Sequence, residues 1–311
     1  MLPTVDFCGL KMTRLLIGAN PFGGFSHQTP ERDLEMKTWA TPDRILETWG
    51  RAWDAGINTF VTNNETEHVI HATERYLAEG GPMQWIGQLA MRSHPTMMDS
   101  LDEAKKIGAS AVYFHGGYVD GFYKEQDASE LEKWVAHAKS IGLPVGVAGH
   151  SPLVHDWVNS LDLVDFHVVC IFNCGSLHAG TGHRFQLCDL PKAYECIQRI
   201  EKPCIAYKIM GAGRVDPLMA FEYCFDNIKP GDICNVGMHR GDKDDIVEEN
   251  VGFVKDILSR MTGPPVGALP RARWRRAGIS GRGERSYRQR IRRPMIRWRL
   301  HEETAARPHQ P

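Results

Sequence analysis

Short apolar runs alternate with amphipathic segments along the first 260 residues. Eight of these runs are rich in β-branched and aromatic residues, which predicts strands. The predicted strands are Arg14–Asn20, Thr59–Asn63, Gln84–Ala90, Ala111–Gly117, Pro144–His150, Asp165–Asn173, Pro203–Ile209 and Ile233–His239. The segments between them have helical periodicity, at residues 43–55, 66–79, 97–107, 128–141, 151–160, 190–200, 214–228 and 244–259. Glycine follows several of these helices, as in AGIN (55–58) and IGAS (107–110), where it suits a left-handed C-cap.

Eight uninterrupted strand–helix units predict an α/β fold, a closed (β/α)₈ barrel. A doubly wound open sheet is the alternative, but even spacing at about 30 residues a unit favours closure. Catalytic groups in such barrels lie where strands end and the loops to the helices begin. The residues at the strand ends are therefore the first candidates for a site.

Each predicted strand ends in a polar or ionisable side chain, although a packed barrel interior favours Val, Ile and Leu. We predict four catalytic residues among them, His115, His150, Lys208 and His239. We expect substrate contacts from Asn20, Asn63, Gln88 and Asn173. Each residue also has a structural interpretation, because a single histidine is more often a hydrogen-bonded structural group. The convergence of several on one face favours a binding or catalytic site.

The sequence around these residues adds detail. His115 lies in YFHGG, where two glycines allow a ligand or neighbouring backbone to approach closely. His150 precedes Ser151, which we expect to cap the next helix. Lys208 in a shielded site would act as a base, an electrophile or a Schiff-base amine, and the alternative is a solvated amine at the rim.

Two long connections predict lids or specificity elements, residues 21–42 and 174–189. The second contains His178 and His183, which are candidate metal ligands although their spacing matches no established motif. The best carboxylate candidates are Glu65 and Glu67, which also suit the first turn of a helix.

Several stretches resemble the aldo-keto reductases in the order of that family. They are GLKMTRLLIGANPFGG (9–24), AGINTF (55–60), GVAGHSP (146–152), IFN (171–173), IAYKIMGAG (205–213) and VGMHRGDKDDIVEEN (236–250). The resemblance covers roughly residues 8–258 and implies the same barrel. Of the family's catalytic Asp, Tyr, Lys and His, only the histidine is matched, by His115. Val61 and Thr66 stand where the Asp and Tyr are expected, and Gln88 lies near the position of the Lys.

The resemblance also implies part of an NADP site. Tyr207 matches the tyrosine that stacks on nicotinamide, Arg240 lies near the residue that meets the 2′-phosphate, and Glu249 and Asn250 match the adenine-side pair. Two other cofactor positions differ, with Ala148-Gly149 in place of Ser-Asn and Val169 in place of Gln.

These observations predict an enzyme related in fold to the aldo-keto reductases, with its reaction class left open. We expect it to act on a small polar carbonyl or sugar-like substrate by acid–base chemistry of the isomerase or lyase type. The alternatives are an NADP(H)-dependent oxidoreductase with a rewired proton donor, metal-assisted catalysis through histidines, and a binding protein without activity.

Charge divides the chain in two. Residues 1–260 carry 24 basic and 35 acidic residues, whereas residues 261–311 carry 13 arginines, no lysine and 3 acidic residues. We therefore predict a barrel domain at 1–260 and a tail at 261–311 that is disordered or lies outside the native reading frame. Nucleic acid would bind only through this tail. The chain has no run of 18 apolar residues and no CxxC pair, so we expect a soluble cytoplasmic protein with reduced thiols.

Overall fold

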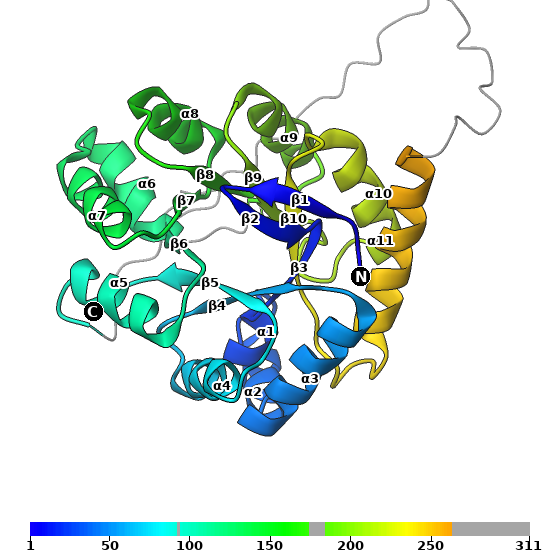
Figure 1. The fold of residues 1–311 in the computed structure, drawn as a ribbon. Helices are drawn as coiled ribbons and strands as arrows, with labels where there is room; N and C mark the ends of the chain where they lie inside the picture. Colours follow the sequence, from blue (N-terminus) through cyan, green and yellow to red (C-terminus); the bar gives the residue numbers. More distant parts are fainter. Residues whose placement is uncertain (92–93, 174–183, 263–311) are drawn as a thin grey trace, which may run out of the picture. The chain divides into compact units, whose positions relative to one another are not determined.

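Eight parallel strands close a barrel in the computed structural model, which describes residues 1–91, 94–173 and 184–262 (Figure 1). The strands follow one another around the barrel in the order β10-β3-β4-β5-β6-β7-β8-β9. Their bounds are β3 Leu15–Gly18, β4 Thr59–Asn63, β5 Gln84–Leu89, β6 Ala111–Phe114, β7 Val145–Gly149, β8 Phe166–Cys170, β9 Cys204–Tyr207 and β10 Ile233–Gly237. The closed (β/α)₈ barrel predicted from the sequence is confirmed, and the open sheet is excluded.

Helices surround the barrel on its outside (Figure 1). Their bounds are α1 Asn20–Gly23, α2 Pro30–Trp39, α3 Pro42–Ala55, α4 Glu67–Ala78, α5 Met97–Ile107, α6 Gly116–Glu125, α7 Ser129–Ser140, α8 Pro152–Leu161, α9 Asp189–Arg199, α10 Pro217–Asn227 and α11 Ile246–Thr262. Each predicted helical segment has its counterpart. The connection 21–42, expected to be a long loop, instead contains most of α1 and all of α2, and α6 begins inside the segment predicted as the fourth strand.

Strand residues alternate between two apolar layers, as the pleat requires. Leu16 and Ile86 belong to the cluster inside the barrel. Leu15 and Trp85, their neighbours in sequence, belong to the cluster between strands and helices. This alternation fixes which residues near the strand ends point inward, and it predicts an inward direction for Gln88, two residues beyond Ile86.

A hairpin closes the N-terminal end of the barrel. Strands β1 (Thr4–Phe7) and β2 (Leu10–Thr13) pair antiparallel and lie across the barrel opening in Figure 1. Phe7 and Met12 are fully buried in the interior cluster, and the Phe7 ring lies 5.2 Å from that of Phe166. Any site inside the barrel must therefore open at the other end, where the strands end. We call that end the mouth.

Local signals for the helix ends agree with the structure. Gly56 and Gly108 end α3 and α5 with φ of +116° and +115°, as their positions after the helices predicted. The Ser151 side chain accepts a hydrogen bond from the amide of Leu153 at the start of α8, which confirms the predicted cap. These ends set the angle at which each chain segment leaves the mouth.

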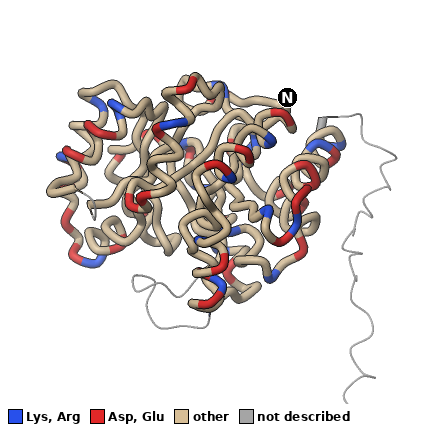
Figure 2. Tube along the Cα trace, turned by 90° about the horizontal axis from the view of Figure 1, so that it is seen from below, with Lys and Arg blue, Asp and Glu red and all other residues tan. Residues whose placement is uncertain are grey.

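Figure 2 shows basic and acidic residues interspersed along the outer helices of the barrel. No helix among the described residues is long and apolar enough to cross a membrane. The last helix runs to Thr262, slightly past the expected boundary at residue 260. The chain divides into units at Met1–Pro264 and Pro265–Pro311, and the second unit lies outside the described residues, as does the predicted tail beyond Thr262.

Candidate functional site

His150 and Asp120 form a buried pair just beyond β7. The Asp120 carboxylate accepts a hydrogen bond from Nδ1 of His150 at 2.7 Å, and the two side chains are 7% and 6% exposed. The other carboxylate oxygen accepts the backbone N–H of His150 at 3.1 Å. An ionised carboxylate only accepts hydrogen bonds, so Nδ1 carries the proton and the neutral ring has its lone pair on Nε2.

Gly116 explains how the His150 ring fits beside the start of α6. A Cβ at position 116 would lie 2.8 Å from Cε1 and 3.0 Å from Nδ1 of His150. The two glycines after His115 were expected to allow a close approach. At the first of them, the group that approaches is the imidazole of His150.

His115 has the opposite arrangement of hydrogen bonds. It is the N-cap of α6, and its Nδ1 accepts the backbone N–H of Gly117 at 3.0 Å. Because Nδ1 accepts, the proton of the neutral ring is on Nε2. The His115 and His150 ring centroids are 6.3 Å apart. The structure thus brings together two of the predicted catalytic histidines, and their neutral rings differ in having the lone pair on Nε2 in His150 and the proton on Nε2 in His115.

Lys208 follows β9 in a left-handed conformation, with φ of +61°. Such a conformation is uncommon for a residue other than glycine, although six other non-glycine residues among the described ones also have positive φ. The Lys208 ammonium lies 5.2 Å from the ring centroid of Tyr207, which is the last residue of β9. A cation over an aromatic face is attracted by the ring, so the two side chains form a unit at the strand end.

Gln88 and Asn63 pair across neighbouring strands of the barrel. Gln88 accepts a hydrogen bond from the Tyr113 hydroxyl at 3.0 Å. The Asn63 side-chain oxygen instead accepts the backbone N–H groups of Glu65 and Thr66, so part of its role is to shape the turn before α4.

The other two predicted substrate residues lie outside this group of contacts. Asn20 is exposed at the first position of α1. The backbone of Asn173 bonds to Asp189 and Phe185. Substrate contacts from Asn20, Asn63, Gln88 and Asn173 stay predictions.

His239 is buried at the start of the connection to α11. It is 3% exposed, its ring packs edge-on to Trp39 at 5.0 Å, and neither ring nitrogen has a hydrogen-bond partner among the described residues. Burial lowers the pKa of His239, which favours the neutral ring. No contact joins it to His115 or His150 in the described part of the chain, so the catalytic role predicted for it stays a prediction.

The residues that the family resemblance implies for NADP make contacts within the chain. Arg240 is 7% exposed, and its guanidinium bonds to Glu47 at 2.7 Å and Asp244 at 2.6 Å. Glu249 pairs with Lys243 at 2.5 Å. The Arg240 guanidinium is already paired with two carboxylates, whereas a 2′-phosphate would need the same group as its partner. This arrangement therefore does not fit the phosphate.

Asn250 is 1% exposed, and its side-chain oxygen has no partner among the described residues. The adenine-side role that the resemblance implies for it therefore requires the helix surface to open.

No group of three or more His, Cys, Asp or Glu side chains among the described residues could hold a metal ion. The candidate ligands His178 and His183 lie outside the described residues.

Sequence reasoning missed Asp120 and Tyr113. Asp120 lies in the middle of α6, and this helix was hidden by the glycines of HGGYVDG. A carboxylate five residues after a strand-end histidine was the available signal. Tyr113 lies in an apolar strand. Its ring fits the apolar pattern of that strand, so nothing in the sequence marked its hydroxyl as functional.

Comparison with known proteins shows the fold. No family model and no curated protein matches the chain. Two structures of a proposed aldo-keto reductase from Pseudomonas aeruginosa are 18% and 17% identical, with TM-scores of 0.54 and 0.56, and each match covers 82% of this chain and 94% of the other. The predicted resemblance to aldo-keto reductases is confirmed at the level of the barrel.

Other barrels match about as well. Orotidine 5′-monophosphate decarboxylase from Methanocaldococcus jannaschii is 13% identical with a TM-score of 0.53, over 79% of this chain and 99% of the decarboxylase. The protein Gox0644, in a structure described as a complex with NADPH, is 13% identical with a TM-score of 0.52, over 83% and 94%. Similarity at this level shows fold and does not select a chemistry.

Proposed function

We propose that the protein is an acid–base enzyme that moves a proton on a small polar carbonyl or sugar-like substrate. The observation that carries the proposal is the opposite hydrogen bonding of two neighbouring imidazoles. Asp120 fixes His150 with an acceptor at Nε2, whereas the Gly117 amide fixes His115 with a donor at Nε2. An isomerase needs both functions, since one group removes a proton and another supplies one.

In this mechanism His150 removes the proton on the carbon next to the carbonyl. The Asp120 carboxylate fixes the orientation of the ring and stabilises the imidazolium that forms. This is the usual role of a carboxylate that accepts a hydrogen bond from a catalytic histidine. His115 donates its Nε2 proton to the substrate oxygen, which produces an enediol. When the deprotonated carbon bears a hydroxyl, the His150 imidazolium returns its proton to the former carbonyl carbon, and His115 takes back a proton from that hydroxyl, which completes an isomerisation. In a lyase reaction the leaving group would instead depart from the carbon β to the carbonyl, on the other side of the deprotonated carbon.

Lys208 supplies positive charge at the mouth in the same proposal. Negative charge develops on the substrate oxygen as the proton leaves, and a preorganised cation stabilises it more in a water-excluded site than in bulk water. The left-handed backbone at Lys208 is a conformational cost that a role at this position would explain.

Proton transfer can be tested before the substrate is known. The protein is incubated in D₂O with hydroxyacetone, dihydroxyacetone, glyceraldehyde and common aldoses and ketoses, and deuterium on carbon is followed by NMR. We expect exchange next to the carbonyl of at least one compound, reduced roughly 10²–10⁴-fold in His150→Gln and in His115→Gln. Equal exchange in wild type and both variants would refute the proposal.

An NADP(H)-dependent oxidoreductase is the alternative that the fold suggests. The structural neighbour described with NADPH favours it, and the internal ion pairs of Arg240 disfavour it. Titration with NADPH, followed by cofactor fluorescence, separates the two functions. Binding that is weakened by Arg240→Ala would support the oxidoreductase, and no binding at millimolar cofactor would remove it.

A further inference from the structure

Tyr113 places a hydroxyl inside the barrel wall with a single acceptor. The residue is 4% exposed, and among the described residues its hydroxyl bonds only to the side-chain oxygen of Gln88. Burial raises the pKa of Tyr113, so the hydroxyl keeps its proton. A buried hydroxyl proton without an acceptor would destabilise the fold.

This hydrogen bond decides the orientation of the Gln88 amide. If the amide were turned over, its NH₂ group would face the Tyr113 oxygen, and the phenolic proton would lose its acceptor. The Gln88 oxygen must therefore face Tyr113, and the NH₂ group faces away. Gln88 cannot then offer an acceptor to a ligand without breaking this bond.

The NH₂ group of Gln88 lies on the inner side of the barrel. Gln88 pairs with Tyr113 across β5 and β6, and Tyr113 belongs to the interior cluster. Gln88 is only partly buried, and its amide nitrogen has no protein partner among the described residues. The Gln88 NH₂ group is thus a hydrogen-bond donor of fixed orientation on the inner wall, below the mouth. It lies on β5, next to the strand that His115 follows.

We propose that Gln88 donates a hydrogen bond to the carbonyl oxygen of the substrate and that Tyr113 is the positioning residue that keeps this amide a donor. The inference rests on the proposed function and deepens it, because it commits the site to ligands with a carbonyl oxygen. A ligand with a hydroxyl in the same place can also accept, but its own proton would lack an acceptor there, because the Gln88 oxygen is held by Tyr113.

A matched pair of probes tests the donor without turnover. Hydroxyacetone and 1,2-propanediol differ only in a carbonyl against a hydroxyl. Each is titrated into ¹⁵N-labelled protein while the side-chain amide signals are followed, with Gln88→Leu identifying the Gln88 pair. We expect the Gln88 signals to shift with the ketone and the ketone to bind roughly 3- to 10-fold more tightly than the diol, as a single hydrogen bond allows.

The variants separate positioning from folding. In Tyr113→Phe the preference for the ketone should fall toward one, as it should in Gln88→Leu, while thermal denaturation checks that both are folded. Tyr123→Phe makes the same change within α6, where the ring packs on Trp157 of α8, and should keep the preference. Equal binding of ketone and diol by wild type, no binding of either, or an unchanged preference in Tyr113→Phe would overturn the inference.

The outcomes also distinguish this inference from the proposed function. A ketone preference that depends on Tyr113, in a protein that exchanges no deuterium on any carbonyl compound, would support the Gln88 donor and refute the proton transfer. Deuterium exchange that depends on His150, without a ketone preference, would support the proton transfer and refute the Gln88 donor.

Discussion

At the scale of single residues, hydrogen bonds assign roles that residue type leaves open. The sequence placed His115 and His150 at strand ends, and a histidine there can serve as acid, base, ligand or cap. The partners decide between these roles, since one ring bonds to a carboxylate and the other to a backbone amide. The sequence did not reveal these partners, because Asp120 is 30 residues from His150 in the chain.

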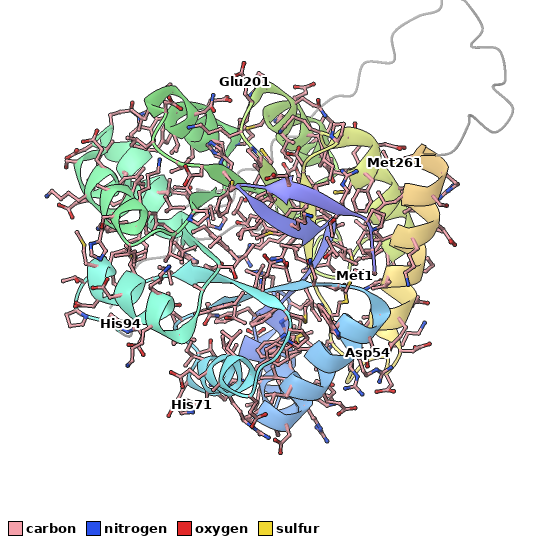
Figure 3. All side chains as sticks on the ribbon, viewed as in Figure 1. Met1, Asp54, His71, His94, Glu201 and Met261 are labelled. Atoms are coloured by element: carbon pink, nitrogen blue, oxygen red, sulfur yellow. The ribbon has the colours of Figure 1, made fainter. Side chains whose placement is uncertain are left out.

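We predict that Asp120→Asn lowers deuterium exchange by about 100-fold, within the usual range for acid–base groups. An asparagine removes the charge that stabilises the imidazolium, and its NH₂ group can donate to Nδ1 and reverse the tautomer. The rate of exchange is compared with that of Asp54→Asn, a surface change (labelled in Figure 3) that should have no effect. An Asp120→Asn protein as active as wild type would contradict the role of this pair.

Gly116 offers a second test at this scale. In Gly116→Ala the new methyl would lie 2.8 Å from the His150 ring, so we expect destabilisation of about 1–3 kcal/mol and loss of exchange. Gly121 lies on the same helix with open space around its Cβ position, so Gly121→Ala should stabilise by about 0.5–1 kcal/mol. Urea denaturation measures both. Similar stabilities for the two variants would show that the ring does not fill that space.

At the scale of elements, a second pair of histidines ties α8 to the barrel wall. His155 and His167 are fully buried, with their Nδ1 atoms 3.1 Å apart, and His155 also bonds through Nε2 to the carbonyl of Gly149 at 3.4 Å. A neutral pair satisfies these contacts when His155 donates from Nε2 and His167 donates from Nδ1. Through the bond to the Gly149 carbonyl, the pair connects α8 to the end of β7, next to His150.

Burial lowers the pKa of His155 to about 4 and that of His167 well below its usual value. The unfolded chain binds protons near pH 6.5, whereas the native pair does not, so stability is complete above pH 6.5 and is lost as the pH falls toward 4. For His155 alone we expect a loss of about 2 kcal/mol between pH 7 and pH 5.

Urea denaturation at both pH values measures this loss. The variant His155→Gln/His167→Gln should lose much of the pH dependence, and His71→Gln, an exposed histidine labelled in Figure 3, should retain it. A wild-type stability that does not change between pH 7 and pH 5 would contradict the buried neutral pair.

Periodicity predicted the strands and most of the helices because each of them buries one face against a common core. It failed at α1, α2 and α6 for local reasons. Proline and glycine in residues 21–42 are typical of loops, yet Pro30 suits the first turn of α2, where no amide donor is needed. At α6, the glycines included in the predicted strand 111–117 are the first residues of a helix capped by the His115 ring.

At the scale of the whole molecule, the N-terminal hairpin closes one end of the barrel. The hairpin fills the N-terminal end with Phe7 and Met12, so a site formed by strand-end side chains would face the mouth. The order of the strands predicted that several polar side chains share this end, and the described contacts bring two of them, His115 and His150, close together. It could not predict which polar groups lie in contact, because the register of each strand against the next is set by packing.

Removal of residues 263–311 provides a test at this scale. The last described helix ends at Thr262, and the residues before it carry the acidic charge. We predict that a chain ending at Thr262 keeps its melting temperature within about 2 °C and its deuterium exchange, because no group of the proposed mechanism is lost. Calorimetry and the exchange assay check this. A marked fall in either quantity would show that the Arg-rich segment contributes to the barrel or its site.

The tautomers of His115 and His150 are the central claim, and they can be measured without a substrate. Long-range ¹H–¹⁵N correlation spectra near pH 8 distinguish a protonated ring nitrogen from an unprotonated one, and His115→Gln and His150→Gln identify the two rings. The hydrogen bonds predict protonated Nδ1 in His150 and protonated Nε2 in His115. The same tautomer in both rings, or an unprotonated Nδ1 in His150, would contradict the proposed acid–base pair.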